Sequence, residues 1–468
     1  MVSIHPPFHG GHSTRVGLEY FTAMRPTYAE VEQALLGRWP ETRLDPTLDR
    51  IMALCRLLGD PQRGYPVVHL TGTNGKTTTA RMIDALLREL DLRTGRFTSP
   101  HLQSMTERIS IDGRPLTEDE FVDAFADVAA YAQIVDDSAA QPLSFFEMMV
   151  AMAYAAFADA PVDAAVIEVG MGGVWDATNV ADGVVAVIGP VGVDHAAYLG
   201  DDPISIATEK AGIIKPGAQV IVAEQFPDVL DVIARRAAEV GASVLHEGRD
   251  FGVADHAIAV GGQQLSIQGC AARYDGIFVP LHGAHQAQNV ACAVAGVEAF
   301  LGGKALPTDV VAAALGGVTS PGRLEVIRRS PTVVLDAAHN PHGIEAMVAA
   351  IQDSFSFAPL IGVVGVMGDK DVERILELLE PVLAQVVCTQ NSSSRSMPAP
   401  HVGDLADGIF GSDRVLVAPR LDEAIERAIA LAETTEGYEE ALGSGGVLIT
   451  GSVVTVGEAR VLLGGAPQ

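Results

Sequence analysis

The chain has 468 residues and carries 59 acidic side chains against 31 basic ones, which gives a formal net charge of −28. It is 48% hydrophobic and 19% charged, an ordinary globular composition, and at roughly 150 residues per domain its length predicts two or three domains. The negative charge argues against nucleic acid as a partner, because such binding depends on basic patches. A site for a small anionic ligand would have to be built locally from Lys, Arg, metal ions and helix N-termini.

Cysteine usage and hydropathy bear on the compartment. Cys55, Cys270, Cys292 and Cys388 lie far apart with no CxxC pair, which predicts reduced core residues instead of disulfides or a zinc site. No apolar run approaches the roughly 18 residues of a membrane span. Residues 1–17 lack an apolar signal core and are expected to form a flexible tail. We therefore expect a cytoplasmic protein without a membrane partner, and a monomer.

The first predicted elements are two helices, followed by a strand and a third helix. The stretch TYAE is a capping box, in which the hydroxyl of Thr27 and the carboxylate of Glu30 cap the first helix. The second helix is predicted over DPTLDRIMALCRLLG, ending at Gly59. A strand follows over residues 67–70, then a glycine loop and a helix over residues 76–90.

Strand and helix patterns alternate along the rest of the chain. The runs AAVIEVG and VVAVIG are typical of strands covered on both faces, so we predict an α/β fold with a doubly wound, mostly parallel sheet. Gly, Ser and Pro cluster in GGVTSPGR. There we place a boundary between an N-terminal P-loop, ATP-binding domain, residues 1–317, and a smaller Rossmann-like α/β domain, residues 318–468. In the second domain the strand patterns TVVLD, LIGVVGV, AQVVCT, RVLVA and GVLIT alternate with helices.

The glycine loop GTNGKTT is the strongest functional signal. A strand that leads through such a loop into a helix directs backbone N–H groups and the helix dipole at one point. Gly72 and Gly75 let the backbone wrap an anion, Lys76 can reach the β- and γ-phosphates, and the hydroxyls of Thr77 and Thr78 can orient a phosphate or Mg²⁺. The predicted nucleotide-binding residues are Gly72, Thr73, Asn74, Gly75, Lys76, Thr77 and Thr78. The alternative is a plain turn capped by Thr, and the loop is two residues shorter than GxxxxGK[ST].

GTNGKT resembles the Mur ligase superfamily, whose members form amide bonds with ATP. Further segments narrow the resemblance to the folylpolyglutamate synthase/dihydrofolate synthase family, and the specific feature is their order along the chain. These segments are FTSPHL, ERISIDG, IEVGMGGVWDATN, VDHAAYLG, EKAGIIKPG, GAHQAQN, PGRLE, LDAAHNP and ITGSVVTVGEAR. The resemblance implies ATP and two Mg²⁺ ions as cofactors. The implied substrates are L-glutamate and an acceptor, which is dihydropteroate, reduced folate or both.

Metal binding is expected at the carboxyl ends of the strands. Glu168 follows AAVI, where α/β folds place ligands, and its carboxylate suits Mg²⁺ shared with phosphates. The resemblance implies a metal shell of Ser99, Glu168 and His195, with a carbamylated Lys210 at the second ion. From the residues alone, Glu168 could cap a turn, His195 could be a structural histidine bonded to Asp194, and Lys210 could be a solvated helix lysine.

The resemblance also implies contacts to the nucleotide from distant segments. Asn289 would read the adenine edge, and Arg323 would reach the phosphates from the second domain, a task that suits its guanidinium group. Asp336 and His339 align with nucleotide-contacting positions. A helix-surface amide remains the alternative for Asn289. The catalytic residues implied in this way are Lys76, His195, Lys210 and Arg323.

Three further residues are implied to bind the other substrates. Phe146 resembles the residue that packs on the pterin ring, although an aromatic residue at helical spacing is more often core. Arg395 and Ser452 would hold the incoming glutamate by pairing with its carboxylate and by hydrogen bonding at a helix N-terminus. A plain N-cap is the alternative for Ser452.

The expected reaction is phosphoryl transfer from ATP to the acceptor carboxylate, followed by attack of the glutamate amine on the acyl phosphate. A Mur-type ligase that adds an amino acid to a UDP-muramyl precursor is one alternative, favoured by Thr77 and Thr78 where folate ligases usually carry Gly-Ser. Against it, the residues before Gly72 contain no βαβ pattern that could hold UDP. A non-catalytic nucleotide-binding regulator is the other alternative, but it would be expected to lose Lys76, Glu168 or His195.

Overall fold

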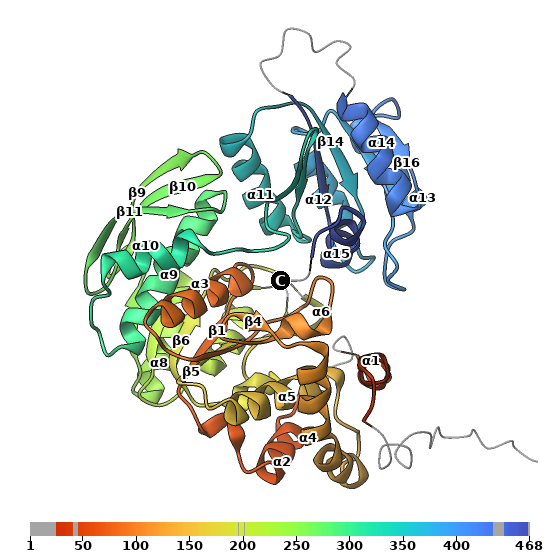
Figure 1. The fold of residues 1–468 in the computed structure, drawn as a ribbon. Coiled ribbons are helices and arrows are strands. Elements are labelled where there is room, and N and C mark those ends of the chain that lie inside the picture. The colour runs from red at the N-terminus through yellow and green to blue at the C-terminus, as the bar shows by residue number, and fades with distance from the viewer. Residues whose placement is uncertain (1–24, 41–44, 195, 201, 434–443, 467–468) are drawn as a thin grey trace, which may run out of the picture.

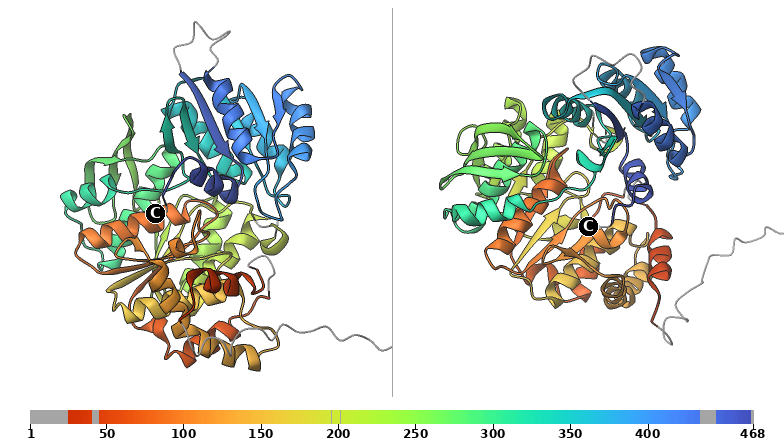
Figure 2. Two further views of the ribbon diagram at one scale, coloured as in Figure 1. Left: turned by 45° about the vertical axis from the view of Figure 1, so that its right-hand side comes forward. Right: turned by 45° about the horizontal axis from the view of Figure 1, so that its top comes forward.

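The computed structural model describes residues 25–40, 45–194, 196–200, 202–433 and 444–466, and the tail predicted over residues 1–17 lies outside this part. The described strands form sheets of eight, three and six strands. Figure 1 shows the six-stranded sheet, in blue, beside the eight-stranded sheet, with the three-stranded sheet, in green, to one side. The turned views in Figure 2 keep this arrangement. We call the first two sheets with their helices the N-terminal unit and the six-stranded sheet with its helices the C-terminal unit.

The eight-stranded sheet has the order β4-β3-β2-β5-β1-β6-β7-β8. Its neighbours pair in parallel except β2 with β3 and β3 with β4, which confirms the predicted mostly parallel sheet. The strands are β1 (Val67–Thr71), β2 (Thr94–Phe97), β3 (Ile109–Ile111), β4 (Arg114–Pro115), β5 (Ala164–Glu168), β6 (Gly183–Ile188), β7 (Gln219–Val222) and β8 (Ser243–His246).

Helices cover both faces of this sheet, so alternate residues of its central strands enter different cores. On β1, Val68 and Leu70 pack with residues of α3, α9 and α10, whereas Val67 packs with α4 and α5 on the other face. Burial on both sides explains why these strands are continuous apolar runs. The helices are α1 (Tyr28–Leu36), α2 (Asp49–Leu57), α3 (Lys76–Glu89), α4 (Glu118–Ser138), α5 (Phe145–Asp159), α6 (Ala196–Leu199), α7 (Pro203–Lys210), α8 (Pro227–Val240), α9 (Ala284–Phe300) and α10 (Thr308–Gly316).

The N-terminal helices form where the sequence predicts them. Thr27 caps α1 and exchanges hydrogen bonds with Glu30, which confirms the capping box. Helix α2 ends at Leu57, just before the left-handed Gly59 with φ 84°.

The three-stranded sheet was not predicted. Its strands β9 (Gly252–Ala259), β10 (Gly262–Gln268) and β11 (Arg273–Val279) pair in antiparallel fashion. One face packs on α9 and α10 through residues such as Leu265 and Ile277, while the intervening side chains are more exposed. Buried and exposed residues alternate with a period of two along these strands, and this alternation was the signal in the sequence that could have predicted them, although polar residues and glycines interrupt it.

The C-terminal unit is a second α/β layer structure, as predicted. Its sheet has the order β12-β13-β17-β14-β15-β16 and is parallel except between β12 and β13. The edge strand β12 and the helix α13 were not predicted. The strands are β12 (Glu325–Arg329), β13 (Thr332–Leu335), β14 (Phe357–Val364), β15 (Gln385–Cys388), β16 (Val415–Val417) and β17 (Ser444–Thr450). The helices are α11 (Pro341–Ser354), α12 (Val372–Leu379), α13 (Ala399–Phe410), α14 (Leu421–Glu433) and α15 (Val453–Leu462).

The four cysteines are free, and three of them, Cys55, Cys292 and Cys388, are buried as expected, whereas Cys270 is partly exposed. Among the helices in the described ranges, none has the length and apolar character needed to cross a membrane.

A buried ion pair between β2 and α3 yields a stability prediction. Arg96 donates to Asp84 at 2.7 Å and both side chains are buried, whereas Arg93, on the preceding turn, lies 3.6 Å from Asp112 with both side chains about half exposed. Arg96→Ala leaves the buried Asp84 with only the half-exposed Arg88, 3.4 Å away, as a cationic partner, so it should lower the free energy of unfolding by about 3 kcal/mol. Arg93→Ala should lower it by less than about 1 kcal/mol. Urea denaturation of both variants measures the difference, and equal losses would contradict this account of the pair.

Candidate active site

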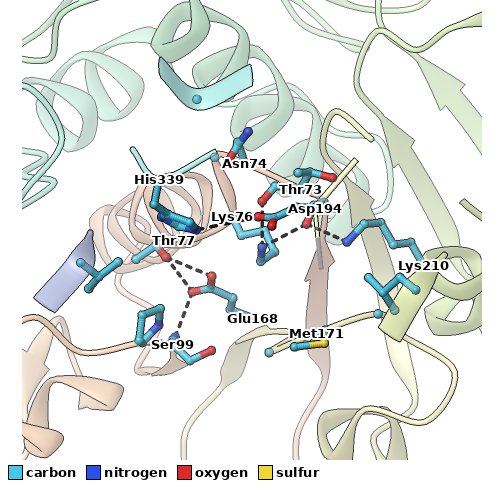
Figure 3. Close-up of a pocket in the computed structure, with 18 of the residues that line it drawn as sticks. Thr73, Asn74, Lys76, Thr77, Ser99, Glu168, Met171, Asp194, Lys210 and His339 are labelled. Carbon is cyan, nitrogen blue, oxygen red and sulfur yellow. Dashed lines mark hydrogen bonds and ion pairs between the residues drawn. The ribbon is translucent and has the colours of Figure 1, made fainter. Parts of the chain in front are cut away.

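A cavity of about 1200 Å³ lies between the two units. The glycine loop after β1 and the segments after β5, β6 and β7 line it, so it sits at the carboxyl ends of the parallel strands, where such sheets bind ligands. The C-terminal unit adds residues from the starts of α11, α12 and α15. Every site residue predicted from the sequence lines this cavity except His195, which lies outside the described residues. Figure 3 shows the part of the cavity around the glycine loop.

The glycine loop has the geometry of an anion-binding turn. Gly75 is the N-cap of α3 with φ 81°, a left-handed conformation that favours glycine. Because glycine has no side chain to cap the helix, the first-turn N–H groups of α3 remain available to a ligand. The Lys76 ammonium group folds back onto the loop and donates to the carbonyl oxygens of Gly72 at 3.0 Å and Thr73 at 3.2 Å. The hydroxyl of Thr78 lies 2.8 Å from the hydroxyl of Ser320, which stands in the segment that leads to the C-terminal unit.

Glu168 ends β5 directly beside this loop. Its carboxylate is only 1% exposed and accepts hydrogen bonds from the Thr77 hydroxyl, at 3.0 Å to each oxygen, and from the Ser99 backbone N–H at 3.2 Å. Burial raises the pKa of this carboxyl, and the Lys76 ammonium and the Thr77 hydroxyl act in the opposite direction. The structure thus places Ser99 and Glu168, two of the metal ligands that the resemblance implies, next to Thr77, whose hydroxyl was predicted to orient a phosphate or Mg²⁺.

Lys210 lies in the same place, at the end of α7. It is 4% exposed, so the alternative of a solvated surface lysine is wrong. Its ammonium group donates to the carbonyl oxygen of Gly72 at 2.9 Å, the oxygen that also accepts from Lys76. Burial, and then repulsion from Lys76, lower the pKa of Lys210 to about 7. Two ammonium groups that share one carbonyl oxygen form a locally positive site in an acidic protein, the arrangement that an anionic ligand needs.

The predicted nucleotide contacts come from both units. Asn289 on α9 is buried and packs against the loop, where a Cβ added to Gly75 would lie 2.5 Å from the Oδ1 atom of Asn289. The alternative of an amide on the helix surface is therefore wrong. Arg323 lines the cavity from the segment between the units. Asp336, just after β13, accepts from the backbone N–H groups of Leu324 and Ala338, both at 2.9 Å. Those two bonds fix the backbone next to Arg323 and the turn into α11.

His339 approaches the cavity from the C-terminal unit. Its Nδ1 lies 2.9 Å from the carbonyl oxygen of Ala337, and burial lowers its pKa. Its Nε2 lies 3.8 Å from the carboxylate of Asp194 in the N-terminal unit.

The three residues predicted to bind the other substrates also line the cavity. The Phe146 ring packs against Gly170 and lies 5.8 Å from the Phe97 ring, so this aromatic residue is both part of the core and part of the cavity wall. Arg395 is half exposed and pairs with Asp369 at 2.9 Å. Ser452 is the N-cap of α15, the alternative role considered for it from the sequence, and it also lines the cavity.

Sequence reasoning missed a second group of cavity residues beyond Phe146. There Arg50 bonds Glu147 at 3.1 Å and packs over the Trp39 ring, and Asp176 has its pKa raised to about 6 by burial. All four line the cavity. Asp176 stands in the recognised stretch WDATN, which could have drawn attention to it, but the ion pair of Arg50 on α2 with Glu147 on α5 leaves no local pattern.

The donor set fits magnesium. The Glu168 carboxylate and the hydroxyls of Thr77 and Ser99 offer oxygen atoms, the ligand type that Mg²⁺ prefers. In the described part of the chain, no group of three or more His, Cys, Asp and Glu side chains is placed so that it could hold a metal ion. One carboxylate with hydroxyl groups suits an ion that takes its remaining ligands from phosphate and water.

Comparisons with known proteins agree with this geometry. The family models of the Mur ligase middle domain and of the Mur ligase glutamate ligase domain match residues 70–297 and 322–452. The chain is 48% identical over 459 residues to the dihydrofolate synthase/folylpolyglutamate synthase of Mycobacterium tuberculosis, with 94% of each chain covered. A solved M. tuberculosis folylpolyglutamate synthase complexed with ADP superposes with a TM-score of 0.91 at 48% identity, covering 94% of this chain and 99% of that one. Escherichia coli FolC in complex with DHPP and ADP is also similar, with a TM-score of 0.80, 27% identity and coverage of 94% and 98%.

The contact between Gly75 and Asn289 yields a prediction for nucleotide binding. In Gly75→Ala the new methyl group would collide with the Asn289 amide and the backbone would be strained, which should weaken ADP binding by about tenfold or more. Gly217→Ala is the control, because Gly217 has a similar φ of 75° but nothing lies within 4 Å of its added Cβ. Calorimetric titration with ADP measures both affinities. Wild-type affinity in Gly75→Ala would contradict the assignment of the loop.

Proposed function

The chain belongs to the folylpolyglutamate synthase/dihydrofolate synthase family of Mur ligases, and from this membership we propose how its cavity joins L-glutamate to pteroate and folate acceptors with ATP. The chain is an ATP-dependent glutamate ligase with both the dihydrofolate synthase and the folylpolyglutamate synthase activity. The observation that carries the proposal for the site is the position of Lys76 and Lys210 on one carbonyl oxygen beside the buried Glu168.

In the first step we propose that the nucleotide lies on the glycine loop. Similar proteins have been solved in complex with ADP, which supports a nucleotide as the ligand, and the anion-binding geometry of the loop supports this position. An acceptor carboxylate oxygen bonds to the γ-phosphorus of ATP as the bond from that phosphorus to the bridging oxygen breaks, and ADP leaves. Lys76, from the loop, and Arg323, from the other side of the cavity, balance the charge on the transferred group.

In the second step the glutamate amine attacks the acyl carbon of the acyl phosphate. The amine loses a proton, inorganic phosphate leaves with the electron pair of the C–O bond, and an amide remains. Catalysis rests mostly on placing the amine and the acyl carbon together in a closed cavity. Arg395 and Ser452 are proposed to hold the glutamate, and Phe146 to pack on the pterin ring. The E. coli protein with bound DHPP supports an acceptor of this class.

Magnesium is proposed to bind at Glu168, Thr77 and Ser99, with His195 as a further predicted ligand. The buried Lys210 is proposed to be carbamylated and to serve a second ion, because a buried site next to the Lys76 ammonium suits a carboxylate-like group better than a second ammonium. When bound, magnesium would neutralise charge on the phosphate oxygens. Asn289, Asp336 and His339 keep their proposed roles around the nucleotide.

Three broader features are proposals as well. The division into domains at residues 317 and 318 remains a proposal; Val318 still packs with the N-terminal unit and Leu324 with the C-terminal unit, so the hydrophobic cores change between these two residues. A cytoplasmic compartment is supported by the free cysteines. The protein is proposed to act as a monomer, because residues of this single chain line the cavity on both sides.

The acceptor can be tested directly. Purified protein with Mg-ATP and labelled L-glutamate should transfer label to dihydropteroate and to tetrahydrofolate when each is offered separately, because the family comprises both activities. UDP-muramyl-alanine, offered in parallel, should remain unlabelled. Label on the muramyl compound alone would overturn the assignment, and label on one folate acceptor alone would restrict it.

The role of Lys76 gives a second prediction. Lys76→Ala should lower turnover by about 100-fold or more, since a charge that stabilises the transferred phosphoryl group is lost. Lys304→Ala removes an exposed lysine far from the cavity lining and should leave turnover unchanged. Circular dichroism checks that both variants fold. Near-native rates in Lys76→Ala would show that the loop does not bind the phosphates.

A further inference from the structure

Asp194 lies where the N-terminal unit meets the C-terminal unit. It follows β6 in a loop at the cavity, and its side chain is 10% exposed. Its Oδ1 atom accepts from the Lys370 ammonium at 2.8 Å, and its Oδ2 atom accepts from the Asn340 amide at 2.8 Å. Both partners belong to the C-terminal unit, and the Lys370 side chain is itself only 12% exposed. This ion pair is therefore shielded from solvent, unlike the exposed pairs that contribute little.

One of these partners, Asn340, also contacts the glycine loop. Asn340 and Asn74 exchange amide hydrogen bonds at 3.3 and 3.4 Å, and the Asn74 amide lies 3.0 Å from Nδ1 of His342. Asn340 is fixed in turn because it caps α11, accepting from the Gly343 N–H at 2.8 Å. The N-terminus of this 14-residue helix thus faces the loop, and the Asp194 carboxylate beside it is favoured by the helix dipole.

The C-terminal unit also contacts the N-terminal unit at a second place, around Leu102 and Gln103. Gln103 donates to the carbonyl oxygen of Gly465 at 2.9 Å, and Gly457 packs closely on Leu102. The chain segment before Arg323 also connects the two units covalently. If the contacts of Asp194 were lost, these attachments would remain, so the unit would loosen without separating or unfolding.

We propose that Asp194, Lys370 and Asn340 form a latch that sets the C-terminal unit over the nucleotide loop. Asp194 and Lys370 are then positioning residues, which act through Arg323 and His339 by fixing their reach to a nucleotide held on the loop. This inference rests on the proposed function for its kinetic readout. The loop residues that bind the phosphates belong to the N-terminal unit, whereas Arg323 acts on the transferred phosphoryl group, which ADP lacks. Loss of the latch should therefore lower kcat much more than it weakens ADP binding.

Kinetics of Asp194→Asn, Lys370→Ala and the double variant test the latch. Each single variant should lower kcat by about tenfold or more with the dissociation constant of ADP within about threefold of wild type. The double variant should be no slower than the slower single variant, because both changes break one contact. Asp194→Asn keeps the size of the side chain, so it removes the charge without leaving a cavity. Arg374→Ala is the control: Arg374 is half exposed on α12 and pairs within the C-terminal unit, so its loss should change nothing.

Hydrogen exchange of the same variants gives an independent readout. Peptides that cover residues 72–79 and 339–347 should exchange faster in Asp194→Asn and Lys370→Ala than in wild type or Arg374→Ala. An unchanged kcat in Lys370→Ala, multiplied losses in the double variant, or a loss of ADP affinity as large as the loss of kcat would overturn the latch. Absence of ligase turnover in the wild type would instead refute the proposed function, and the exchange data would still report on the latch.

Discussion

In the unmodified chain the amino groups of Lys76 and Lys210 share the carbonyl oxygen of Gly72, and this crowding of positive charge governs the site. Burial and the nearby Lys76 lower the pKa of Lys210, because a second positive charge is unfavourable at this point, and the proposed carbamylation of Lys210 would remove that charge. Glu168 balances part of the charge, but its carboxylate is occupied by Thr77 and Ser99. A triphosphate with magnesium would supply the missing negative charge and the metal together. A protein with a net charge of −28 can therefore attract an anion to one point of its surface.

The remainder of the fold brings a second set of groups to this point. The parallel sheet places the ends of β1, β5 and β6 side by side, so the loop, Glu168 and Asp194 share one edge. The C-terminal unit then adds Arg323 and His339 from the opposite side. Neither unit contains both sets, so the reaction depends on how the units are held together. Polar contacts beside the loop join the two units, from Asp194 to Lys370 and Asn340 and from Asn74 to Asn340.

The sequence was informative where structure follows from local pattern. The parallel strands were recognisable as apolar runs, and the glycine loop by its residue types between a strand and a helix. Recognition of the family motifs added Lys210, which no periodicity would have singled out. The antiparallel strands β9 to β11 escaped because only one face is buried and polar residues interrupt the alternation. The pair of Asp194 with Lys370 joins positions 176 residues apart, and pairing at such a distance leaves no mark in local sequence.

The central claim is that the glycine loop holds the nucleotide phosphates within reach of Lys76, Glu168 and Arg323. A crystal structure of this protein with ADP and magnesium tests it most directly. We expect the β-phosphate on the first-turn N–H groups of α3, with the metal bound to oxygen atoms of Glu168 and Thr77. A nucleotide found elsewhere, with the loop empty and the Lys76 ammonium still on the Gly72 carbonyl oxygen, would contradict the account.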